Sequence, residues 1–97
     1  MASIIPDEEK LKALDRVNGL LTEVRQINEA INENGLYRLS FPARKKYLDI
    51  DSAQADKIVL ALRKMKETRV REIERTAAKY RIELDEGERE VLSPAAG

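Results

Sequence analysis

The sequence predicts an all-α fold: an elongated antiparallel helical hairpin followed by a short C-terminal helix, forming a single helical domain over residues 1–97. Two long segments in which apolar residues recur with a period of 3.6 predict the two main helices. Start signals precede both segments. Leu, Ile, Val and Phe contribute 25 of the 97 residues, and 18 basic residues balance 18 acidic ones. This composition favours a folded chain over a disordered one.

The first helix is predicted over residues 6–33. Pro6 suits the first helical position, and the acidic residues at 7–9 favour a helix N-terminus. Gly19 weakens the helix by about 1 kcal/mol, and because the apolar pattern keeps its phase we expect a continuous helix, with a break at Gly19 as the alternative. Gly35 is typical of a helix C-cap and ends it. One face carries the apolar stripe: Ala13, Leu14, Val17, Leu20, Leu21, Val24, Ile27 and Ile31.

The connector over residues 36–50 loses the helical period. Apolar and polar residues alternate from Tyr37 to Phe41 and again from Leu48 to Ile50, with a proline between the two runs. Alternation of this kind is typical of short strands, although an isolated hairpin is marginal unless it packs on something. Two alternatives therefore stay open, a small β-hairpin around a proline turn or an irregular connector.

The second helix is predicted over residues 52–80, because Asp51 and Gln54 have the spacing of a capping box. Its length, about 45 Å at a rise of about 1.5 Å per residue, predicts an elongated molecule. Its apolar positions follow a period of 3.6: Ala55, Ile58, Leu62, Met65, Ile73, Ala77 and Tyr80.

A short last helix is predicted over residues 86–92, followed by a frayed tail over 93–97. Asp85 and Glu88 repeat the capping-box spacing at its start. Residues 81–84 then form the exit from the second helix, since Ile82 would fall on the wrong face if that helix continued.

Two helices packed as a hairpin bury one face each, so part of the apolar stripe of the first helix would remain wet in a monomer. We therefore expect self-association, most simply a two-fold homodimer that forms a four-helix bundle with coiled-coil-like packing. Asn28 lies within the apolar stripe and suits the role of fixing register.

The connector is the best candidate for a partner-binding site, because aromatic and basic residues are interleaved in it. Three interpretations compete: its apolar residues, Leu48 among them, cover the open end of the helical hairpin, it docks a protein partner, or it binds nucleic acid or a nucleotide. The candidate partner-binding residues are Tyr37, Arg38, Phe41, Arg44, Lys45, Lys46 and Tyr47.

Lys66 and Arg69 fall within the apolar stripe of the second helix. Either their long stems cover apolar surface while the charged ends reach water or an acidic residue such as Asp15, or they form a pocket that binds a small anion. The sequence alone supports both alternatives.

The charge distribution and the missing residue types limit the function. Residues 36–81 carry a net charge of +7 between segments of −3 and −4, which suits either contacts within and between copies or an anionic partner. The absence of His and Cys excludes Cys/His zinc sites, thiolate nucleophiles, disulfides and His-based triads. The carboxylates lack the spacing of a calcium-binding loop, and we expect no metal or cofactor.

We therefore expect a non-enzymatic protein-interaction module that acts as a homo-oligomer on an unidentified protein partner, as an adaptor, assembly factor or inhibitor. The alternative is nucleic-acid or nucleotide binding through residues 36–81. No signal segment or apolar run long enough to span a membrane is present, so we expect a soluble, cytoplasmic protein without membrane contact.

Overall fold

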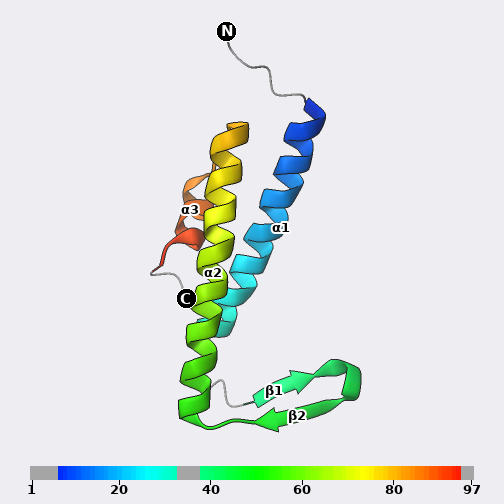
Figure 1. Ribbon diagram of the computed structural model, residues 1–97, viewed down its shortest axis with the longest axis vertical. Helices are drawn as coiled ribbons and strands as arrows, with labels where there is room; N and C mark the ends of the chain where they lie inside the picture. Colours follow the sequence, from blue (N-terminus) through cyan, green and yellow to red (C-terminus); the bar gives the residue numbers. More distant parts are fainter. Residues whose placement is uncertain (1–6, 33–37, 95–97) are drawn as a thin grey trace.

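The computed structural model of the chain describes residues 7–32 and 38–94, and for residues 38–42 it describes the backbone alone. The predicted all-α helical hairpin with a short C-terminal helix is confirmed (Figure 1). The molecule is elongated, with principal extents of 58, 30 and 18 Å. Its elements are α1 (Asp7–Asn32), β1 (Arg38–Phe41), the 3-10 turn η1 (Pro42–Arg44), β2 (Lys46–Asp49), α2 (Ser52–Tyr80) and α3 (Glu86–Leu92).

The core lies where α1, α2 and α3 meet. Each fully buried Val, Leu or Ile side chain contributes about 1.5 to 3 kcal/mol of hydrophobic stabilisation, so this core is the main source of the stability of the fold. Val70, Ile82, Leu84 and Val91 are half-buried against it. The buried cluster consists of Val17, Leu20, Leu21, Val24, Ile73 and Leu92.

Local hydrogen bonds explain where α2 and α3 begin. The Asp51 carboxylate accepts from the Gln54 amide at 2.8 Å, and the Gln54 side chain accepts from the Asp51 amide at 3.1 Å. Asp85 and Glu88 make the same reciprocal pair at 2.7 and 3.1 Å. Both helices have the bounds that the sequence predicts, while the predicted signals at Pro6 and Gly35 lie outside the described residues.

Arg81 ends α2 and turns the chain back toward the core. Its backbone is left-handed, with φ of 54° and ψ of 43°, and its amide donates to the Ala77 carbonyl. The next amide, of Ile82, donates to the same carbonyl at 2.9 Å. Because the turn reverses the chain, Ile82 and Leu84 pack against the buried cluster instead of continuing outward. This is the predicted exit from the second helix.

Candidate interaction surface

The connector forms an antiparallel β-hairpin, so the first of the two alternatives for residues 36–50 is correct for its described part. Position 39 pairs with 48, and position 41 pairs with 46. Residues 42–45 form the loop, in which Lys45 has a left-handed backbone with φ of 50°. Left-handed residues are common in hairpin loops, although glycine or asparagine usually fills them.

The hairpin lies at the end of the molecule where α2 begins and extends sideways from the helices (Figure 1). Tyr47 is 66% exposed and Leu48 is 50% exposed. Successive residues of a strand point to opposite faces of a sheet. Since these two are neighbours in β2, the described side chains leave both faces of the ribbon open to solvent.

The structure places the candidate partner-binding residues as follows. Arg44, Lys45 and Lys46 lie at the hairpin turn and are exposed, directly before Tyr47. Arg38 and Phe41 lie in β1, where their side chains are outside the described part, and Tyr37 lies outside the described residues altogether. Leu48, which one interpretation assigned to the open end of the helical hairpin, is instead half exposed on the ribbon.

Lys66 and Asn28 hold the end of α3. Lys66 is a buried residue whose ammonium donates to the Ser93 carbonyl at 2.8 Å, and the Asn28 amide nitrogen donates to the Val91 carbonyl at 3.0 Å. The last carbonyls of a helix lack donors within the helix, so these two side chains act as caps. Burial, and secondly the charge of Arg63, lowers the pKa of Lys66 below its usual range.

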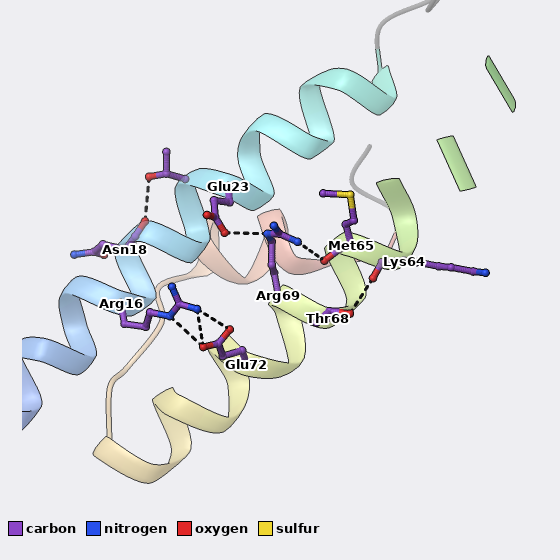
Figure 2. A network of polar contacts seen from close by, with 9 residues as sticks. Arg16, Asn18, Glu23, Lys64, Met65, Thr68, Arg69 and Glu72 are labelled. Atoms are coloured by element: carbon purple, nitrogen blue, oxygen red, sulfur yellow. Dashed lines mark hydrogen bonds and ion pairs between the residues drawn. The ribbon is translucent and has the colours of Figure 1, made fainter. Parts of the chain in front are cut away.

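Arg69 joins the two long helices instead of lining a pocket with Lys66. Its guanidinium donates to the Glu23 carboxylate of α1 at 2.9 Å and to the Met65 carbonyl at 3.2 Å (Figure 2). The acidic partner is Glu23, whereas the sequence suggested Asp15. Lys66 and Arg69 thus direct their charged groups to different partners, α3 and α1 respectively.

A second pair, Arg16 of α1 and Glu72 of α2, links the two long helices closer to the start of α1 (Figure 2). Arg16 contacts both carboxylate oxygens of Glu72, at 3.0 and 3.2 Å. Both side chains are well exposed, at 59% and 40%, so the pair contributes at most about 1 kcal/mol. Such pairs align the helices more than they stabilise them.

Sequence reasoning missed one exposed surface, on the outer side of α1. Asp7, Glu8, Leu11 and Asp15 are all exposed, and Leu11 is 62% exposed. At helical spacing these four residues are neighbours on the face opposite the core. The carboxylates spaced around Leu11 carry this signal in the sequence, but an acidic first turn is equally typical of a helix start.

Comparisons with family models, curated proteins and solved structures found no match to this chain. Among the described residues, no helix is long and apolar enough to cross a membrane. Within those same ranges, no three or more acidic, His or Cys side chains gather in a way that would hold a metal ion.

Proposed function

We propose that this chain is a non-enzymatic protein-interaction module, an adaptor, assembly factor or inhibitor that acts as a homo-oligomer, and that the β1–β2 hairpin is its docking element. One observation carries the proposal: Tyr47 and Leu48 stand exposed on opposite faces of a two-stranded ribbon. An isolated two-stranded hairpin is at best marginally stable in water. A partner that covers one face supplies the packing that the ribbon lacks.

The chemistry of the hairpin suits protein recognition. Exposed tyrosine and arginine side chains often provide most of the binding energy of an interface, and Tyr47 and Arg44 are of these types. A two-stranded ribbon also has two outer edges whose backbone groups are available to a further strand. A partner therefore has two ways to bind, by packing on a face or by extending the sheet.

Site-specific photo-crosslinking tests the proposal. A photo-reactive amino acid replaces Tyr47 on the hairpin, or Lys64 on an exposed position of α2 as the matched control. We expect crosslinked products with protein, including a second copy of the chain, from position 47 and few from position 64. Equal yields from the two positions would show that the hairpin is not a docking element.

Nucleic-acid binding is the second candidate, favoured by three consecutive exposed cations at the hairpin turn, Arg44, Lys45 and Lys46. A two-stranded ribbon fits the DNA major groove, and cations at its tip would neutralise phosphates. Binding of a labelled oligonucleotide at several salt concentrations tests this function. Replacing the three cations with alanine should lower the log-log salt slope by about 2 to 3. An unchanged slope, or no binding at low salt, would eliminate this candidate.

A further inference from the structure

Two exposed surfaces of this chain complement each other in charge and in apolar content. The first, the hairpin tip, consists of Arg44, Lys45, Lys46, Tyr47 and Leu48, all of them exposed. It combines three positive charges with an aromatic and an aliphatic side chain. Surfaces with this composition bind partners that offer carboxylates around an apolar contact.

The second surface, the acidic stripe, has that composition. It consists of Asp7, Glu8, Leu11 and Asp15 on the outer side of α1. Leu11 follows Glu8 by three residues and Asp7 by four, and Asp15 follows Leu11 by four, so the three carboxylates surround the leucine.

Among the described residues of one copy, little neutralises the acidic stripe. Glu8 has an ion pair with Lys12 at 3.7 Å, but the two side chains are 83% and 77% exposed. A pair of this kind between helix neighbours contributes about 0.3 to 0.5 kcal/mol, so its loss to a better partner is inexpensive. The stripe is therefore available to external cations.

The two surfaces lie at opposite ends of a molecule 58 Å long, as the positions of the start of α1 and of the hairpin show (Figure 1). They do not meet within one copy. In an antiparallel dimer, the α1 helices of the two copies lie side by side along their 26 residues, in opposite directions. The first turn of each α1 then lies beside the last turn of the other copy's α1, and the hairpin follows that last turn in the chain. A two-fold axis then forms both contacts at once and closes the assembly.

We infer that the hairpin tip of each copy docks on the acidic stripe of a second copy in an antiparallel, two-fold dimer. The inference rests on the proposed role of the hairpin as docking element and names its occupant. Arg44 and Lys46 face the carboxylates of Glu8 and Asp15, while Leu48, on the same face of β2 as Lys46, packs against Leu11. Charge complementarity fixes the antiparallel orientation, because a parallel pair would place like charges together.

Complementary charge reversal tests the inference by sedimentation velocity. One variant carries Arg44→Glu and Lys46→Glu, and the other carries Glu8→Lys and Asp15→Lys, so Lys45 in its left-handed turn and Asp7 at the helix start stay unchanged. We expect the wild type to be a dimer and each variant alone to dissociate at least tenfold more readily. An equimolar mixture of the two variants should dimerise again, because both of its contacts then join opposite charges.

The control variant, Lys64→Glu with Arg71→Glu, makes the same charge change on exposed positions of α2 and should stay dimeric. Circular dichroism of each variant confirms that it is folded. The inference is overturned if the wild type is a monomer, if either single-sided variant dimerises as the wild type does, or if the mixture stays monomeric. In each case crosslinking from position 47 to a different protein would leave the proposed docking function standing.

Discussion

The ammonium of Lys66 lies 2.8 Å from the carbonyl oxygen of Ser93 and donates a hydrogen bond to it. This contact joins the middle of α2 to the residue that follows α3. Asn28 of α1 donates to the carbonyl of Val91. The end of α3 is thus held by one polar side chain from each long helix, in addition to the burial of Leu92. Because burial lowers the pKa of Lys66, we expect the stability of the domain to depend on the protonation of this lysine.

We predict that Lys66 makes stability rise with pH between its lowered folded-state pKa and its pKa in the unfolded chain. Burial, followed by Arg63, lowers the pKa of Lys66 in the folded chain below 10.5, so the unfolded chain binds this proton more tightly. The charged form of Lys66 therefore destabilises the folded chain at pH values below the folded-state pKa. This destabilisation decreases as the pH rises from the folded-state pKa toward the pKa of Lys66 in the unfolded chain. Urea unfolding at neutral pH and at about pH 10 should show the wild type gaining stability relative to Lys66→Met. A difference that does not vary with pH would contradict the prediction, and exposed Lys64→Met serves as control.

Asn28 should be sensitive to the chemistry of its replacement. Its amide nitrogen caps Val91, while its Oδ1 is buried without a hydrogen-bond partner among the described residues. Loss of the bond in Asn28→Ala should lower the free energy of unfolding by about 1 kcal/mol. Asn28→Asp should cost more, about 2 kcal/mol or above, because it buries a carboxylate against a carbonyl oxygen.

Urea unfolding measures both losses, and hydrogen exchange shows whether the amides of α3 lose protection first. Gln26→Ala, at an exposed position of the same helix, is the matched control and should change stability little. If Asn28→Asp is no more damaging than Asn28→Ala, the Asn28 side chain does not cap α3 as described.

Local signals made the helices predictable. The capping boxes at Asp51 and Asp85 are complete within four residues of sequence, and each one sets a helix start through its own hydrogen bonds. The apolar stripe of α1 likewise follows from its spacing, and its central residues Val17 and Val24 are fully buried. Local patterns therefore located these helix starts and the core face of α1, but the same period placed Met65 in the apolar stripe of α2, where it is 42% exposed.

Contacts between distant segments were not predictable in the same way. Arg69 pairs with Glu23 instead of Asp15 because the register of α1 against α2 decides which acid is near, and no local pattern encodes that register. The left-handed Lys45 carries no glycine or asparagine signal. The partners of Lys66 and Asn28 depend on the reversal at Arg81, which returns α3 to the helical hairpin. The position of the hairpin tip relative to the acidic stripe likewise depends on how the helices and the hairpin are arranged in the fold.

The turn at Arg81 offers a stabilising substitution. Its φ of 54° is unfavourable for a residue with a Cβ atom, and its side chain is exposed. Arg81→Gly should therefore raise the free energy of unfolding by about 1 kcal/mol, measured by urea unfolding. Glu83→Gly, at an exposed position without a positive φ, is the control and should be neutral or destabilising. A loss of stability in Arg81→Gly would mean that the Arg81 side chain stabilises the folded state by more than the left-handed backbone at this position destabilises it.

Gly19 offers the opposite test, in the interior of a helix. It lies in α1 at an exposed position, and a Cβ atom added there would meet nothing within 4 Å. Because alanine loses less backbone entropy than glycine on forming a helix, Gly19→Ala should raise the free energy of unfolding by about 1 kcal/mol. The reverse change at an exposed position of α2, Ala61→Gly, should lower it by a similar amount. Thermal unfolding of both variants checks the pair. No gain in Gly19→Ala alongside a loss in Ala61→Gly would indicate that α1 is not helical through Gly19 in solution.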